Sequence, residues 1–110
     1  IMRKNSQSLV GPMAEKSLKN FRVDKAFLGV NGIDPENGFY TPNIEEAYLN
    51  EQMIKISNES IVLADSSKFN VKSLTLICPV NGVDTIVTDV NIRNKDKELV
   101  ENQGVKVVIA

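Results

Sequence analysis

The sequence contains no histidine and no tryptophan, and only one cysteine among its 110 residues. Without histidine the chain lacks the usual general base and the commonest metal ligand, and no cysteine–histidine cluster is present. A single cysteine excludes an internal disulfide and fits a reducing compartment. Because Cys78 closes the apolar run at residues 74–78, we expect a buried rather than a reactive thiol. The sequence therefore predicts no cofactor and no metal site.

Long apolar runs and an excess of one charge are missing as well. No stretch approaches the roughly 20 residues that span a bilayer, and no secretory signal pattern is present. Thirteen basic and fourteen acidic residues give a net charge of −1, whereas a domain that binds DNA by itself normally shows a basic face. With 42% hydrophobic and 25% charged residues, the chain can bury a core. We expect one small cytoplasmic domain, or a piece of one, with no membrane partner.

Helices and strands alternate along the chain. The patterns predict helices at residues 12–20, 43–57 and 92–103, and strands at residues 23–30, 60–64, 72–78, 85–89 and 105–110. This alternation is typical of an α/β fold with a mostly parallel, Rossmann-like sheet and helices on both faces. The strand at residues 72–78 follows the preceding strand too closely for a crossover helix, so we expect an antiparallel neighbour or an edge position for it.

Two further segments are expected at the surface. Residues 34–38 contain the turn signals Asp-Pro and Asn-Gly, which favour a loop. The predicted helix at residues 92–103 is rich in charge, and its charged side chains are most simply a solvated face. Those side chains are Arg93, Lys95, Asp96, Lys97, Glu98 and Glu101.

Polar clusters follow two of the predicted strands and form the candidate ligand site. They are Asn31 and Gly32 after residues 23–30, and Asp65, Ser66, Ser67 and Lys68 after residues 60–64. In an open α/β sheet, small ligands bind just outside the carboxyl ends of the strands. Each cluster also has a purely structural interpretation. Asp65 can cap the strand end and turn the chain, and Asn31-Gly32 can be a simple turn. The clusters alone leave both interpretations open.

Several linked motifs resemble one family. They are the sequence VDKAFLGVNGID at residues 23–34, GFYT at 38–41, LADSSKF at 63–69 and DTIVTD at 84–89, with VGPMA upstream at 10–14. In this order and at these spacings, they resemble the sensor domain of DeoR-family transcriptional regulators over nearly the whole chain.

The resemblance implies a function that composition alone does not give. The family's proteins are bacterial, cytoplasmic repressors of sugar metabolism. Their carboxyl-terminal domain binds a phosphorylated sugar and oligomerises, while a helix-turn-helix domain binds operator DNA. It implies that residues 1–110 are the carboxyl-terminal part of such a sensor domain, without the DNA-binding domain and the first part of the sensor domain. The implied fold is part of the ribose-5-phosphate isomerase / CoA-transferase-like fold.

An isomerase with this fold is the main alternative to a sensor domain, and its sequence motifs are incomplete in this chain. It carries an Asp-Gly-Ala-Asp-Glu run after the strand that corresponds to residues 23–30, where this chain reads LGVNG at residues 28–32. The isomerase's basic glutamate would fall near Asn50 or Glu51. Moving a proton needs a positioned base, whereas holding a phosphate needs only cations and N–H groups. The resemblance therefore favours binding without turnover over an enzyme, with a plain α/β oligomerisation domain as the third alternative.

The Asp-x-x-Lys element of the isomerase survives, and it suggests roles for the candidate residues. Lys68 would attract the phosphate, and Ser66 and Ser67 would offer hydroxyl hydrogen bonds. Asp65 would orient Lys68 or accept a sugar hydroxyl. Asn31 and Gly32 would frame the sugar.

Overall fold

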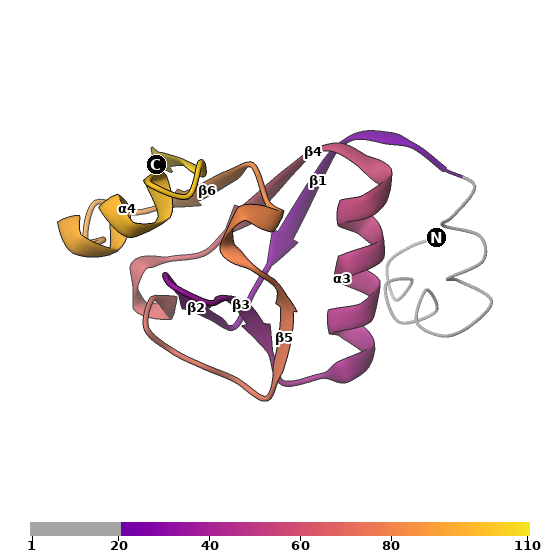
Figure 1. Ribbon diagram of the computed structural model, residues 1–110, viewed down its shortest axis with the longest axis horizontal. Helices are drawn as coiled ribbons and strands as arrows, with labels where there is room; N and C mark the ends of the chain where they lie inside the picture. The colour runs from indigo at the N-terminus through magenta and orange to yellow at the C-terminus, as the bar shows by residue number, and fades with distance from the viewer. Residues whose placement is uncertain (1–20) are drawn as a thin grey trace.

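The computed structural model describes residues 21–110. Four strands of this part form a parallel sheet, with β1, β4 and β6 labelled in Figure 1. The sheet has the order β1-β4-β6-β7, and all three of its strand pairs are parallel. Its strands are β1 (Val23–Gly29), β4 (Ser57–Leu63), β6 (Thr85–Thr88) and β7 (Lys106–Ile109). The prediction of an α/β fold with a mostly parallel sheet is confirmed. The helix predicted at residues 12–20 lies outside the described residues.

Two α-helices, α3 (Ile44–Ile56) and α4 (Asn94–Glu101), occur where the sequence predicts them. Asn43 caps α3, because its side chain accepts a hydrogen bond of 3.0 Å from the backbone N–H of Glu46. Gly104 follows α4 with a φ of +91°, the left-handed conformation that commonly ends a helix. No helix within residues 21–110 is long and apolar enough to cross a membrane.

A second, three-stranded antiparallel sheet packs beside the first in the order β2-β3-β5. Its strands are β2 (Gly32–Asp34), β3 (Gly38–Thr41) and β5 (Thr75–Cys78). The antiparallel neighbour expected for β5 is therefore present. The surface loop predicted at residues 34–38 is instead the tight turn of the β2–β3 hairpin, with Pro35 and Gly38 buried. The turn signals were read correctly, but the strands beside the turn are too short to show a period of their own.

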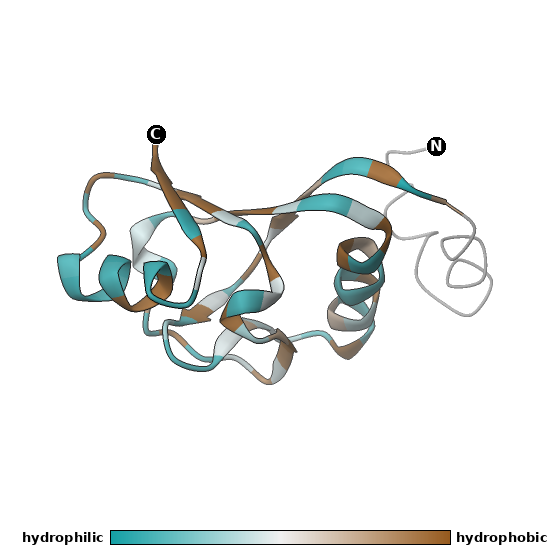
Figure 2. Cartoon of the chain, turned by 45° about the horizontal axis from the view of Figure 1, so that its top comes forward, coloured by the Kyte–Doolittle hydropathy of each residue, from teal (hydrophilic) through white to brown (hydrophobic). Residues whose placement is uncertain are grey.

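The connections of the parallel sheet lie on one of its faces. Its strands follow one another in chain order, and because such crossovers are right-handed, each connection passes over the same side. Figures 1 and 2 both show α3, α4 and the small sheet beneath the parallel strands. Along β1, Ala26 and Leu28 are buried on that side, whereas Phe27 is 61% exposed on the other. Of the helices expected on both faces, the two that residues 21–110 contain lie on one face.

The hydrophobic core joins the two sheets. Its most completely buried side chains come from β2, β3, β4, β6 and α4, and from the turn after β5. They are Ile33, Phe39, Val62, Ile86, Val100 and Val80. Because this core spans both sheets, the small sheet is held firmly against the carboxyl half of the parallel one.

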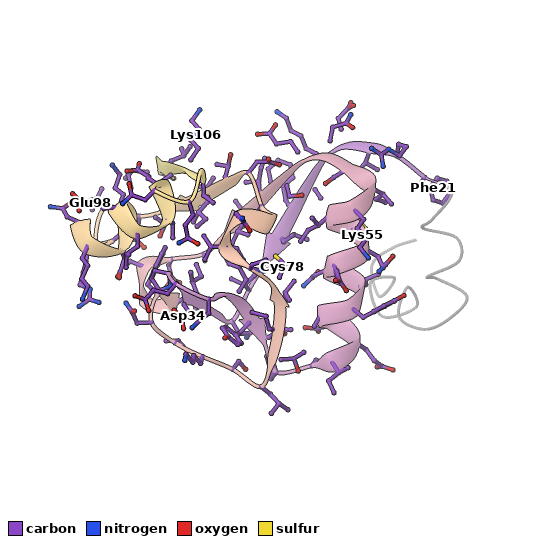
Figure 3. The ribbon with its side chains drawn as sticks, viewed as in Figure 1. Phe21, Asp34, Lys55, Cys78, Glu98 and Lys106 are labelled. Atoms are coloured by element: carbon purple, nitrogen blue, oxygen red, sulfur yellow. The ribbon has the colours of Figure 1, made fainter. Side chains whose placement is uncertain are left out.

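Cys78 at the end of β5 is buried as predicted, and Figure 3 places it in the interior, away from peripheral residues such as Glu98 and Lys106. Burial, together with the charge of Glu51, raises the pKa of its thiol to about 11. The reactive thiolate is therefore scarce at pH 8.

We expect a thiol-specific reagent to modify Cys78 of the folded chain at least tenfold more slowly than in urea. Equal rates in the two conditions would contradict this.

Candidate functional site

The chain leaves β4 through a tight turn that contains one of the two predicted clusters. Ser66–Lys68 form a single turn of 3₁₀ helix, η1, and Asp65 caps it. One carboxylate oxygen of Asp65 accepts hydrogen bonds from the backbone N–H of Ser67, at 3.0 Å, and from the Ser67 hydroxyl. The structural interpretation of Asp65 as a cap is thus realised. We call residues 65–70 the 65–70 loop.

The first end of the 65–70 loop is held by a residue that the sequence prediction did not include. Asp89 directly follows β6, and its Oδ2 accepts a hydrogen bond of 2.8 Å from the backbone N–H of Ser66. Its Oδ1 accepts one of 2.9 Å from the N–H of Asn91. These bonds, with the Ser66 contact first, lower the pKa of Asp89. The available signal was its position, a carboxylate one residue after a strand that neighbours β4.

The lowered pKa of Asp89 predicts a pH-dependent effect of Asp89→Asn. A folded-state pKa below the unfolded value of about 3.9 means that the carboxylate stabilises the fold above that pH, and that this contribution is lost as the pH falls through the lowered pKa. The wild-type chain should therefore be more stable than the variant at pH 6, and the difference should shrink toward pH 3. Urea unfolding at the two pH values measures this. A difference that does not change with pH would contradict the prediction.

Lys68 carries the positive charge of the 65–70 loop. Within the described part of the chain its ammonium forms no ion pair, and Asp65 bonds to Ser67 rather than to Lys68. The half-buried Lys68 side chain starts from the turn that Asp65 and Asp89 hold in place. This charge is therefore available to an anionic group at the carboxyl end of β4.

The backbone of β2 runs next to the 65–70 loop, and this places the second predicted cluster beside the first. Ile33 forms a parallel bridge with Phe69, so the strand that begins at Gly32 runs alongside the end of the 65–70 loop. Asn31 is exposed at the end of β1, and its N–H donates to the carbonyl of Tyr40 at 2.9 Å. The structure thus brings the two predicted segments together.

Gly32 has a packing role that the prediction did not foresee. It is buried, and a Cβ at this position would lie 2.8 Å from the carbonyl carbon of Val71 and closer still to its oxygen. The chain that leaves the 65–70 loop can cross β2 only because Gly32 has no side chain.

The hairpin turn after β2 also contacts the segment that follows the 65–70 loop. The Asp34 carboxylate accepts hydrogen bonds from the N–H groups of Glu36 and Asn37, and lies 3.4 Å from the ammonium of Lys72. Burial acts to raise the pKa of Asp34, but the bonds from Asn37, Glu36 and Lys72 outweigh it and lower the pKa. Figure 3 shows Asp34 on the side of the molecule where β2 and the 65–70 loop meet.

The prediction of a fully solvated charged face on α4 is wrong at one position. Asp96 is only 2% exposed, and its Oδ2 accepts hydrogen bonds from Asn70 Nδ2, at 3.0 Å, and Arg93 Nε, at 3.2 Å. The reason is non-local, since Asn70 reaches Asp96 from the end of the 65–70 loop. The sequence around α4 carries no sign of this partner.

Thr88, the last residue of β6, has a buried hydroxyl with no hydrogen-bond partner in the described part of the chain. Buried hydroxyls are nearly always bonded, so an exception at the carboxyl edge of the sheet is notable. No three histidine, cysteine, aspartate or glutamate side chains among residues 21–110 are arranged to hold a metal ion.

Known proteins are similar to this chain. A family model described as the DeoR C terminal sensor domain matches residues 1–90. A protein of Escherichia coli O157:H7 that is named as a transcriptional repressor of the aga operon is 42% identical over 108 residues, which are 98% of this chain and 40% of that protein.

Two further relatives come from other organisms. The HTH-type transcriptional regulator GlpR of Haloferax volcanii is 34% identical, over 97% of this chain and 42% of its own length. The transcriptional repressor AccR of Agrobacterium fabrum is 35% identical, over 96% of this chain and 41% of its own length. The chain spans about two fifths of the length of these relatives. Since the family model covers most of the chain, it belongs to the DeoR family, as a carboxyl-terminal sensor domain.

Proposed function

We propose that this chain is the effector-sensing part of a sugar-metabolism transcriptional repressor and binds a phosphorylated sugar. The observation that carries the proposal is the 65–70 loop, where Lys68 has no ion-pair partner in the described part of the chain and stands in a turn with two serine hydroxyls. The turn lies at the carboxyl end of β4, beside the end of β1, which is where ligands of open α/β sheets bind.

Each group has a role in this proposal. Lys68 attracts the phosphate. The Ser67 hydroxyl, which donates to Asp65, can accept a hydrogen bond from the ligand, and the Ser66 hydroxyl hydrogen-bonds the ligand as well. Asp65 shapes the turn through Ser67 and can accept a sugar hydroxyl with its remaining lone pairs. The exposed amide of Asn31 contacts the sugar, and Gly32 lets the neighbouring backbone approach closely.

The link to transcription rests on the relatives, whose names describe repressors and regulators. In this proposal, operator DNA is bound by a helix-turn-helix domain that is not among these residues, and the sensor forms homo-oligomers. A bound sugar phosphate can shift the arrangement of the DNA-binding domains only by binding one arrangement more tightly than the other.

Thermal unfolding with a panel of ligands tests the proposal. The panel contains ribose 5-phosphate, fructose 6-phosphate, the two free sugars and inorganic phosphate. At a concentration of one hundred times its Kd, a true ligand stabilises the fold by about 2.7 kcal/mol, so a phosphorylated sugar should raise Tm by several degrees. The free sugars should not. Absence of any response would instead favour a plain interaction domain, and aldose–ketose conversion would favour an enzyme.

A further inference from the structure

Two carboxylates hold the 65–70 loop, one at each end. One directly follows β6 and the other lies in α4. Asp89 at the end of β6 holds Ser66, and Asp96 within α4 holds Asn70. These contacts join residues 23 and 26 positions apart in the chain. The conformation of the loop is therefore not decided by its own sequence alone.

Asn70 is the point where three elements meet. Its N–H donates to the carbonyl of Ile33 in β2 at 2.6 Å, and its Nδ2 donates to Asp96 Oδ2 in α4 at 3.0 Å. Its φ is +65°, and it is the only residue other than glycine with a positive φ in the described part of the chain. Asparagine tolerates this left-handed conformation better than most residues, so the residue type suits both the backbone and the side-chain bond.

The partner carboxylate makes this bond costly to break. Asp96 is only 2% exposed, and its side-chain hydrogen-bond donors in the described part of the chain are Asn70 and Arg93. A buried charge that loses one of its donors pays a desolvation penalty unless another group replaces that donor. A movement of Asn70 away from Asp96 is therefore unfavourable, and this bond couples the end of the 65–70 loop to α4.

We propose that Asn70 and Asp96 form a latch that positions the 65–70 loop and couples it to helix α4. Both are positioning residues, because they act through the loop and not on a ligand. The consequence for ligand affinity rests on the proposed function, whereas the latch itself is a property of the unliganded chain. A ligand that shifts Ser66–Lys68 strains the latch, and α4 is then the element that responds.

Three variants of the full chain test the latch. Asn70→Asp keeps a side chain that tolerates a positive φ but places a carboxylate against Asp96. Asp96→Asn removes the buried charge. The double variant restores one donor and one acceptor with their direction reversed, because the new amide at position 96 can donate to the new carboxylate at position 70.

Amide hydrogen exchange at residues 66–70 is the first readout. We expect Asn70→Asp to speed this exchange by at least tenfold, and the double variant to return it most of the way toward wild type. Asp84→Asn is the matched control. The Asp84 carboxylate accepts a hydrogen bond of 2.8 Å from the N–H of Ser60, so it links the amino end of β6 to the middle of β4, away from the 65–70 loop. The control should lower overall stability without a selective effect on residues 66–70.

Affinity for fructose 6-phosphate or ribose 5-phosphate, whichever binds wild type, is the second readout. It should fall about tenfold in Asn70→Asp, recover in the double variant and stay unchanged in Asp84→Asn. Unchanged exchange in Asn70→Asp, or a double variant no better than that single variant, would overturn the latch. If wild type binds neither sugar phosphate, the proposed function fails, and the exchange readout still decides on the latch.

Discussion

Replacing Gly32 with alanine is expected to destabilise the fold by about 3 kcal/mol, the upper end of the usual cost of overpacking. The new methyl group would lie 2.8 Å from the carbonyl carbon of Val71, which belongs to the backbone and has no flexible end to move aside. The clash can be relieved only if the backbone at Val71 moves away from β2. The Ile33–Phe69 bridge next to it would then be strained as well.

Gly29→Ala is the matched control, because a Cβ there meets nothing within 4 Å. Position 29 ends β1 only three residues earlier, and its φ is not in the left-handed region. This variant should change the free energy of unfolding by less than about 1 kcal/mol. Urea unfolding of both variants gives the comparison. Equal stability of the two would show that Val71 does not cross Gly32 as described.

Replacing Lys68 with alanine is expected to weaken binding of a phosphorylated sugar by ten- to a hundredfold. Hydrogen bonds to charged groups contribute about 1.5–3 kcal/mol, and Lys68 has no ion-pair partner in the described residues that would compensate for its loss. Stability without ligand should hardly change, because the side chain holds no carboxylate in place there. Isothermal titration with the sugar phosphate that gives the largest thermal shift measures the effect.

Lys72→Ala controls for the general loss of a positive charge. Lys72 is four residues further along the chain, and its ammonium is already engaged with Asp34 at 3.4 Å. Its removal should change the affinity by no more than about twofold, as expected for a screened surface charge. Equal losses in the two variants would mean that overall charge, rather than a site at Lys68, attracts the ligand.

The larger elements of the fold could be predicted from sequence because their signals are local. The cap at Asn43, the apolar run that becomes β4 and the glycine after α4 each act within a few residues. The hairpin of β2 and β3 could not be predicted in this way. Its strands have three and four residues, and β3 is paired with β5, where Tyr40 lies opposite Leu76 across a long stretch of chain.

The same distinction between local and long-range signals applies to the candidate site. The 65–70 loop was located from its position after an apolar strand, and the capping role of Asp65 needs only its neighbour Ser67. The residues that hold the loop in place were missed or misread. Asp89 and Asp96 reach it from more than twenty positions away, and a buried aspartate on a helix that is otherwise charged has the same local sequence as an exposed one.

Amide hydrogen exchange of the full chain, with and without a bound sugar phosphate, tests the central claim most directly. If the ligand binds at the carboxyl edge of the sheet, protection should increase at Ser66, Ser67 and Lys68 and at Asn31, and should spread to α4. Protection confined to other parts of the chain, with these amides unchanged while the ligand is bound, would contradict the account.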